Sequence, residues 1–281
     1  MQERWKDINP ALLQKVEICK WTRGEKKQKV ESYLSIEEPL ALEINGQIAA
    51  ILMRLPGNEK ELAVGFCLSE GLVKDMKEIV MVHHCGSLGL SPAAPSDGME
   101  ERNVVKVKTS GEIVRGKDLT MLLVRSGCGR NNLDAAQLDL PVCESGMTVK
   151  AEALGRLLVL LSAEQKLKPI SGGVHSAVLF DPRENVICSF EDVGRHNALD
   201  KVIGYAVMRD ISLNDKIALI TGRASYEMIT KAARVGLPII LSISVPTSLA
   251  VEYAKKCGIT LVGCLRQGRF NIYSHSERIV F

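Results

Sequence analysis

The chain has 281 residues, of which 46% are hydrophobic, 25% charged and 4% aromatic, with a formal net charge of +3. This length suits one large domain or two ordinary ones, and the composition is that of a soluble globular protein. The few aromatic residues disfavour a base-stacking platform for single-stranded nucleic acid, and the small net charge does not by itself point to an anionic partner.

Neither a secretion signal nor a membrane span is predicted. The N-terminal segment is charged and lacks the apolar core of a signal peptide, and no uncharged window approaches the length of a spanning helix. The eight cysteines stand at positions 19, 67, 85, 128, 143, 188, 257 and 264. No two of them form a Cys-x-x-Cys pair, which disfavours zinc-finger and thioredoxin-type sites. We therefore expect a cytoplasmic protein with mostly free thiols and no metal site of its own.

The N-terminal part of the chain is polar, and ordered structure is expected to begin near Tyr33. The basic run Arg23–Lys29 is interpreted as solvated charge on a flexible segment, residues 1–30. Residues 31–120 are expected to form a small mixed α/β domain. Residues 121–281 are expected to form a larger α/β domain that carries the functional sites.

The small domain shows one hairpin and one helix in its sequence pattern. Asn45-Gly46 stands between the apolar runs Leu40–Ile44 and Ile48–Met53, which is a strong hairpin signal. Apolar residues spaced four apart predict a helix over Glu59–Gly71, ended by the glycine. Two further strands are predicted, one at Val80–His84 and one, as an edge strand, at Val104–Lys108.

A cysteine between two glycines follows the apolar run Met121–Val124, which predicts a strand. No neighbouring side chain shields the sulfur of Cys128, and Arg125 and Arg130 flank it. Nearby cations favour the thiolate, which is the nucleophilic form of cysteine. A turn holding an incidental cysteine is the alternative, since most cysteines are small buried hydrophobic residues.

The second half of the chain alternates between strand and helix patterns. A helix over Ala151–Leu161 precedes a hairpin of Val174–Phe180 and Asn185–Phe190, and a helix follows near Ala198–Val207. Strands are then predicted at Ile217–Ile220, Ile239–Ser244 and Ile259–Cys264, with helices at about 225–235 and 247–257 between them. This order indicates parallel strands with helices packed on the sheet.

In such a sheet, ligands bind beyond the carboxyl ends of the strands. Those ends carry Thr221–Ser225, Ser244–Ser248 and Arg266–Arg269. Arginines and helix N-termini are suited to phosphate, so a nucleotide or another phosphorylated ligand is expected at this edge. Ordinary capped turns are the alternative. Neither a P-loop nor a dinucleotide-binding glycine motif is present.

Two acids, an arginine and a histidine share one turn, Glu191–Asn197, at the start of a helix. Asp192 is expected to act as the N-cap of that helix. His196, together with His175, is a candidate proton donor or ligand contact, although each histidine alone has an equally simple structural explanation. The spacing of these residues does not define a Ser-His-Asp triad.

Several stretches together resemble the FdhD family of formate dehydrogenase accessory sulfurtransferases, from about Glu38 almost to the C-terminus. The stretches that carry this resemblance are Gly65–Gly71, Ser126–Gly129, Glu191–Lys201, Arg223–Met228 and Thr260–Arg269. The resemblance implies a homodimer whose larger domain is similar to the cytidine deaminase fold. From the composition and the lack of long apolar stretches, no nucleic-acid or membrane partner is expected.

The resemblance also implies an activity. The family takes sulfur from a cysteine desulfurase as a cysteine persulfide and passes it to the bis(molybdopterin guanine dinucleotide) cofactor of molybdenum or tungsten, bound as a substrate. That cofactor then enters the formate dehydrogenase apoprotein. The persulfide residue corresponds to Cys128. The cofactor-binding residues correspond to Cys264, Leu265, Arg266, Gln267, Gly268 and Arg269.

One departure from the family pattern leaves two hypotheses open. Family members commonly carry Cys-x-x-Cys where this chain has Cys128-Gly129-Arg130-Asn131. A sulfurtransferase with a single carrier cysteine is the first hypothesis. A chaperone that binds and delivers the cofactor without sulfur chemistry is the second. Deaminase activity is not expected, because the zinc signature of that fold is missing.

Overall fold

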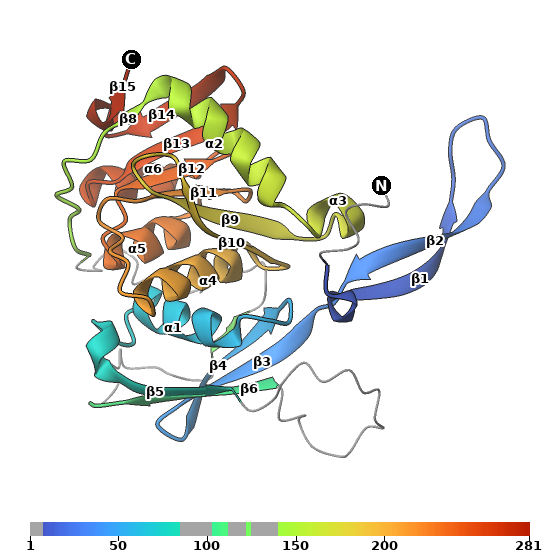
Figure 1. The fold of residues 1–281 in the computed structure, drawn as a ribbon, viewed down its shortest axis with the longest axis horizontal. Helices are drawn as coiled ribbons and strands as arrows, with labels where there is room; N and C mark the ends of the chain where they lie inside the picture. Colours follow the sequence, from blue (N-terminus) through green and yellow to red (C-terminus); the bar gives the residue numbers. More distant parts are fainter. Residues whose placement is uncertain (1–7, 85–102, 112–121, 125–139) are drawn as a thin grey trace.

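The computed structural model describes residues 8–84, 103–111, 122–124 and 140–281. They form a mixed α/β fold, as predicted from the sequence, with two principal sheets (Figure 1). A layer of helices lies between a five-stranded and a six-stranded sheet, and a further helix covers the outer face of the larger sheet.

The smaller sheet has the strand order β5-β6-β3-β4-β7. Its strands are β3 (Glu38–Ile44), β4 (Gln47–Arg54), β5 (Ile79–His84), β6 (Val104–Thr109) and β7 (Leu122–Val124). The predicted hairpin is confirmed as β3 and β4. Its two turn residues, Asn45 and Gly46, have φ values of 49° and 82°, the positive values that a tight hairpin turn requires.

Two expectations for this sheet need correction. Strand β6 is internal, because β5 pairs with it on one side and β3 on the other. Its alternation of buried Val105 and Val107 with exposed residues reflects one buried face, and that pattern cannot reveal how many neighbours a strand has. Strand β7, which was expected to belong to the second domain, pairs with β4 in the smaller sheet.

Helix α1 (Glu59–Ser69) covers the inner face of the smaller sheet and crosses α4 (Arg195–Val207) of the larger part. Glycines on both helices make the crossing close. A Cβ atom at Gly65 would overlap the carbonyl oxygen of Asp200, and one at Gly204 would overlap that of Glu61. Any larger side chain at these positions would force the helices apart.

The larger sheet has the strand order β10-β9-β11-β12-β13-β14. Its strands are β9 (His175–Phe180), β10 (Val186–Asp192), β11 (Ile217–Ile220), β12 (Ile239–Ser242), β13 (Thr260–Arg266) and β14 (Arg269–Ser274). Strands β11, β12 and β13 are parallel, as predicted, and antiparallel strands flank them on both sides.

Helices cover both faces of the larger sheet. They are α2 (Ala151–Glu164), α5 (Tyr226–Arg234), α6 (Ser248–Lys256) and, after α2, the short α3 (Lys168–Ser171). Val178 and Phe180 of β9 pack toward α2, while Ala177 and Leu179 pack toward α4. A short parallel pair, β8 (Val149–Lys150) and β15 (Ile279–Val280), joins the start of α2 to the C-terminus. Among the described residues we find no helix with the length and apolar character that a membrane span needs.

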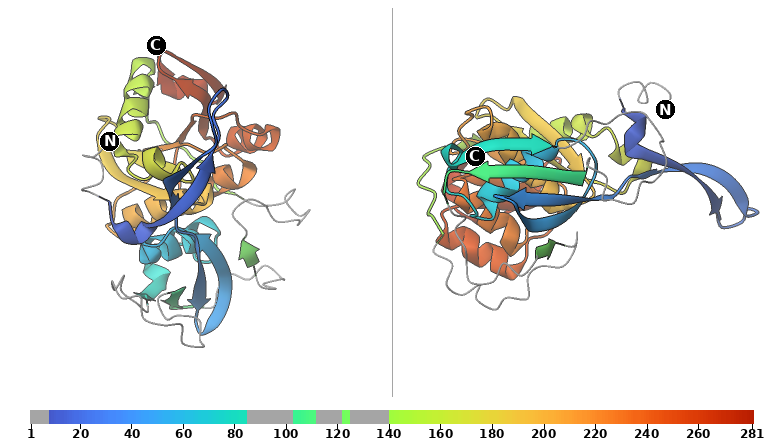
Figure 2. Two further views of the ribbon diagram at one scale, coloured as in Figure 1. Left: turned by 90° about the vertical axis from the view of Figure 1, so that its right-hand side faces the viewer. Right: turned by 90° about the horizontal axis from the view of Figure 1, so that it is seen from below.

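The expectation of a flexible segment before Tyr33 is wrong for part of residues 1–30. Strands β1 (Leu13–Lys20) and β2 (Gln28–Ser35) form an antiparallel hairpin, which we call the arm. Figure 1 and the right-hand view of Figure 2 show it projecting away from the rest of the molecule. The basic run predicted to be solvated forms its exposed tip. The sequence pattern did not predict these strands, because polar side chains lie on both faces of the arm and interrupt the apolar alternation.

Candidate functional site

The predicted sulfur carrier, Cys128, lies in residues 125–139, outside the part of the chain that the structure describes. Its flanking arginines, Arg125 and Arg130, lie there too. The strand that precedes them is described, and β7 pairs in parallel with β4 over Ala50–Leu52. The strand prediction is therefore confirmed, while the role of Cys128 stays a prediction.

Burial removes most of the described cysteines from consideration as nucleophiles. The free thiols are those of Cys19, Cys67, Cys143, Cys188, Cys257 and Cys264. Burial raises the pKa of both Cys67 and Cys188 to about 12, and burial also raises the pKa of Cys257. A thiol with a raised pKa holds its proton and reacts slowly. Of the described cysteines, only Cys19 and Cys264 are not buried.

The predicted ligand edge is present, because the carboxyl ends of β11, β12 and β13 lie side by side. Thr221 follows β11, and its backbone and hydroxyl exchange hydrogen bonds of 3.0 and 2.9 Å with the backbone of Ser176. Ser244 follows β12, and its carbonyl accepts a 3.0 Å hydrogen bond from the backbone N–H of Cys264. The three strand ends therefore form one continuous edge.

Antiparallel pairing brings a second group of residues to the same edge, which the sequence did not reveal. Strand β9 starts where β11 ends, so His175 stands beside Thr221, with 3.5 Å between Nδ1 and the hydroxyl oxygen. His175 also pairs with Asp192, at the end of β10. Burial lowers the pKa of His175, and the charges of Lys168 and Arg195 lower it further. Burial and these two cations therefore favour the neutral form of the His175 imidazole.

Arg195, the first residue of α4, reaches across this edge. The stem of its side chain lies against Gly222, where an added Cβ would come within 2.9 Å of it. The Nε atom is buried and has no hydrogen-bond partner among the described residues. Arg223, which follows Gly222, is exposed. Burial is the main cause of the lowered pKa of Arg195, and the nearby charge of Arg223 lowers it further. The edge thus has cationic character and an unused hydrogen-bond donor.

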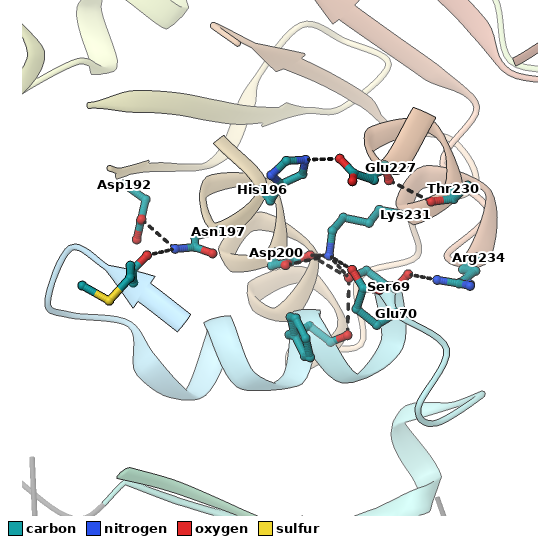
Figure 3. A network of polar contacts seen from close by, with 12 residues as sticks. Ser69, Glu70, Asp192, His196, Asn197, Asp200, Glu227, Thr230, Lys231 and Arg234 are labelled. Atoms are coloured by element: carbon teal, nitrogen blue, oxygen red, sulfur yellow. Dashed lines mark hydrogen bonds and ion pairs between the residues drawn. The ribbon is translucent and has the colours of Figure 1, made fainter. Parts of the chain in front are cut away.

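His196 forms an ion-pair contact with α5. Its Nε2 lies 3.1 Å from Oε2 of Glu227 (Figure 3). This contact is the main reason that the pKa of Glu227 is lowered. Ser225 donates a 3.3 Å hydrogen bond to the same carboxylate oxygen.

The described residues contain no group of three or more His, Cys, Asp or Glu side chains placed to hold a metal ion.

The two acids of the motif Glu191–Asn197 have structural roles. The expected N-cap role of Asp192 is wrong, because Gly194 occupies that position and no side chain caps the helix. Asp192 instead pairs with Lys201 at 2.7 Å and accepts hydrogen bonds from the backbone of Gly194 and the side chain of Asn197. Asp192 is fully buried, and its carboxylate accepts from these donors, which is a structural role.

The same motif ties the larger sheet to the end of β4. Asn197 donates a 2.7 Å hydrogen bond to the carbonyl of Met53, and Lys201 donates a 3.0 Å bond to that of Leu55. Glu191 accepts three hydrogen bonds from backbone N–H groups of residues 166–168 and so stabilises the start of α3. Much of the motif Glu191–Lys201 therefore connects the two sheets. Its residues at the ligand edge are Arg195 and His196.

The predicted cofactor segment, Cys264–Arg269, forms the end of β13, a turn and the start of β14. Cys264 sits at an irregularity in the pairing with φ 53°, and its sulfur lies 3.8 Å from the hydroxyl of Tyr273. The side chain of Leu265 is fully buried in the core, so only its backbone faces the edge. Arg266 and Arg269 pair across the turn and are exposed.

Arg266 is held at the ligand edge by backbone contacts. Its guanidinium donates hydrogen bonds of 2.5 and 2.8 Å to the carbonyls of Ile243 and Leu265. Gln267 and Gly268 form the exposed turn, and the φ of Gly268 is 82°. The structure therefore brings the predicted cofactor segment to the edge that also carries Arg195. Whether these residues bind a cofactor stays a prediction.

Comparison with known proteins identifies relatives along most of this chain. The profile of the FdhD/NarQ family matches residues 35–280. The protein named sulfur carrier protein FdhD from Saccharolobus solfataricus is 37% identical over 255 residues, which cover 89% of this chain and 92% of that protein. The protein of the same name from Streptomyces coelicolor is 37% identical over 256 residues, covering 88% of each chain.

A solved structure shares the fold. It is that of a formate dehydrogenase accessory protein from Desulfotalea psychrophila, with a TM-score of 0.76 and 25% sequence identity. The match covers 96% of this chain and 100% of the other. The mixed α/β arrangement described above is therefore shared with that structure along nearly the whole chain.

Proposed function

Because this chain belongs to the FdhD/NarQ family, we propose that it is a sulfur carrier that serves formate dehydrogenase. In this proposal it accepts sulfur from a cysteine desulfurase as a persulfide on Cys128 and passes it to the bis(molybdopterin guanine dinucleotide) cofactor of molybdenum or tungsten. The observation that carries the proposal is the 37% identity, over 89% of this chain, to a protein named sulfur carrier protein FdhD.

The carrier cysteine in this proposal is Cys128. The high pKa values of Cys67 and Cys188 argue against either as the nucleophile. Cys128 stands between two glycines and two nearby arginines, a setting that favours a thiolate. The thiolate attacks the outer sulfur of the desulfurase persulfide. The sulfur–sulfur bond of that persulfide breaks, and the desulfurase cysteine leaves as a thiolate while Cys128 becomes the persulfide.

The cofactor, as cargo, would bind at the ligand edge. Its guanine dinucleotide portions carry phosphates, which favour arginine side chains and backbone N–H groups. The exposed guanidinium groups of Arg266, Arg269 and Arg223 supply positive charge there, and the unpartnered Nε of Arg195 supplies a buried donor. Burial is the main cause of the lowered pKa of His175, and the charges of Lys168 and Arg195 add to it, as expected at an electropositive edge. These residues support phosphate binding at the edge.

The experiment that tests the proposal is intact-protein mass spectrometry after incubation with a cysteine desulfurase and cysteine. Wild type is expected to gain one sulfur atom, and Cys128→Ala is expected to gain none. Cys264→Ala is the matched control and should gain sulfur as wild type does. An equal gain in wild type and Cys128→Ala would move the chemistry to another cysteine.

A cofactor chaperone without sulfur chemistry is the second candidate, favoured by Asn131 standing where relatives commonly have a second cysteine. That function requires formate dehydrogenase maturation to survive Cys128→Ala and to fail when Arg266 and Arg269 are both replaced by alanine.

The proposal also includes a homodimer in the cytoplasm. The free thiols of the described cysteines support a reducing compartment.

A further inference from the structure

The two faces of the arm differ, because one carries ion pairs and the other carries most of the aliphatic side chains of the hairpin. Paired residues of an antiparallel hairpin share a face, and alternate residues point to opposite faces. On one face Lys15 forms a salt bridge of 2.6 Å with Glu31, and Lys29 forms one of 2.8 Å with Glu17. The side chains of that face therefore satisfy one another in solvent.

The opposite face carries four apolar side chains among polar ones such as Gln14 and Ser32, and none of the four is buried. They are Val16, Ile18, Val30 and Leu34. Ile18 is 40% exposed and Leu34 is 48% exposed, and Trp21, just beyond the strands, is 71% exposed. An isolated two-stranded hairpin is only marginally stable in water, and exposed apolar side chains grouped on one face mark an interaction surface. Tryptophan is also enriched among the residues that dominate binding energy at interfaces.

The tip of the arm adds a concentrated positive charge. Residues 20–29 contain five lysine or arginine residues and one glutamate, a net charge of +4, whereas the whole chain carries +3. Every one of these ten residues is exposed. The arm therefore fits a protein surface that combines an apolar strip with carboxylates around it. A polyanion alone would leave the apolar face uncovered.

The base of the arm lies next to the ligand edge. The hydroxyl groups of Ser35 in β2 and Ser171 in α3 are 2.5 Å apart. Helix α3 leads directly into His175 at the start of β9, and Lys168 of α3 is close enough to lower the pKa of His175. A protein held on the arm would consequently stand beside the edge at which the cofactor binds in the proposed function.

We propose that the arm, residues 13–35, is the docking element for the formate dehydrogenase apoprotein, which it engages through an acidic surface with an apolar centre. This inference rests on the proposed function, in which the apoprotein receives the cofactor bound at the adjacent ligand edge. The apolar face supplies contact area, and the charged tip accelerates and orients the encounter.

The test measures binding of the full chain to the purified formate dehydrogenase apoprotein of the same organism, at 50 and 300 mM NaCl. Lys26→Glu with Lys27→Glu changes the charge of residues 20–29 from +4 to 0 and is expected to weaken binding at least tenfold at low salt. Ile18→Ser with Leu34→Ser is expected to weaken binding at least tenfold at both salt concentrations, since an apolar contact is little screened.

Control variants carry comparable changes at exposed positions elsewhere. Lys106→Glu with Lys108→Glu alters the exposed face of β6, and Val159→Ser alters an exposed position of α2. Both controls are expected to bind within twofold of wild type. Circular dichroism melting of each arm variant verifies that the rest of the fold is unchanged.

The proposal is overturned if wild type does not bind the apoprotein or if the arm variants bind as wild type does. It is also overturned if those variants lose binding only to a second copy of this chain, to anionic vesicles or to the cysteine desulfurase. Sulfur loading of Cys128 by the desulfurase, measured by mass on the same variants, is expected to stay at the wild-type level. Failure of loading in wild type would contradict the proposed sulfur chemistry and leave the binding result standing.

Discussion

Lys231 of α5 donates hydrogen bonds of 2.9 and 2.8 Å to the two carboxylate oxygens of Asp200 in α4, and both side chains are buried (Figure 3). Ser69, at the end of α1, donates a 2.7 Å hydrogen bond to the same carboxylate, and Glu70 pairs with Lys231 at 2.8 Å. Burial opposes the charge of Lys231, but the two carboxylates outweigh it and raise its pKa. One buried cation therefore joins the helix of the smaller sheet to two helices of the larger.

Replacing Lys231 by methionine is expected to destabilise the protein strongly. The change leaves the buried carboxylate of Asp200 without its cation, and breaking a buried pair in this way costs about 3–5 kcal/mol. Urea denaturation should show a lower midpoint, whereas Lys60→Met, at an exposed position of α1, should not shift it. Combining Lys231→Met with Asp200→Leu should recover part of the loss. A double variant that is less stable than Lys231→Met would contradict this account.

The glycines at the α1–α4 crossing give a second stability prediction. Gly65→Ala places a methyl group where the carbonyl oxygen of Asp200 lies, so the helices must separate. Overpacking of this kind costs about 1–3 kcal/mol, and a rigid backbone contact places this substitution at the upper end. Gly146→Ala is the control, because nothing lies within 4 Å of its Cβ position. Thermal melting that finds the two variants equally stable would show that the crossing adjusts freely.

Local sequence patterns were sufficient for most of the secondary structure. The turn at Asn45-Gly46 fixed a hairpin because asparagine and glycine tolerate positive φ, and the apolar runs from Ile217 onward fixed three parallel strands. The ligand edge followed from strand order alone, since the carboxyl ends of neighbouring parallel strands meet.

Pairing between distant segments was not predictable in the same way. Nothing in the run Val104–Thr109 shows that strands flank it on both sides, because pairing partners depend on tertiary structure. His175 joins the edge only because β9 runs antiparallel to β11. Asp192 looked like a helix cap by position, but its buried partner Lys201 lies nine residues later and is visible only in three dimensions.

Thiol labelling should separate the cysteines by burial. Cys67 and Cys188, whose pKa values burial raises to about 12, are expected to resist iodoacetamide at pH 7.5 until the protein unfolds. Exposed Cys19 should be labelled in the native protein. Peptide mass spectrometry after a short exposure gives the order, and Cys128 is expected to be labelled fastest. Labelling of Cys67 at the rate of Cys19 would contradict the packing of α1 described here.

The environment of His175 predicts a pH dependence of stability. Burial lowers its pKa in the folded protein below the ordinary value of 6.5, so in that range the unfolded chain binds more protons. The free energy of unfolding therefore rises with pH through this window and falls as the solution is acidified below about 6.5. Urea titrations between pH 5 and 8 should show a weaker dependence for His175→Gln. His83→Gln, at an exposed position of β5, should retain the wild-type dependence.

Paired removal of Arg266 and Arg269 tests the ligand edge separately from the sulfur chemistry. Each arginine that binds a phosphate contributes about 1.5–3 kcal/mol, so the double alanine variant is expected to lower formate dehydrogenase maturation at least tenfold. Sulfur loading of Cys128, measured by mass, should be unchanged because the persulfide forms before the cofactor is needed. Arg183→Ala is the control, since Arg183 is exposed in the turn between β9 and β10, at the opposite end of those strands. Normal maturation by the double variant would remove this edge as the cofactor site, whereas loss of both maturation and sulfur loading would point to a general folding defect.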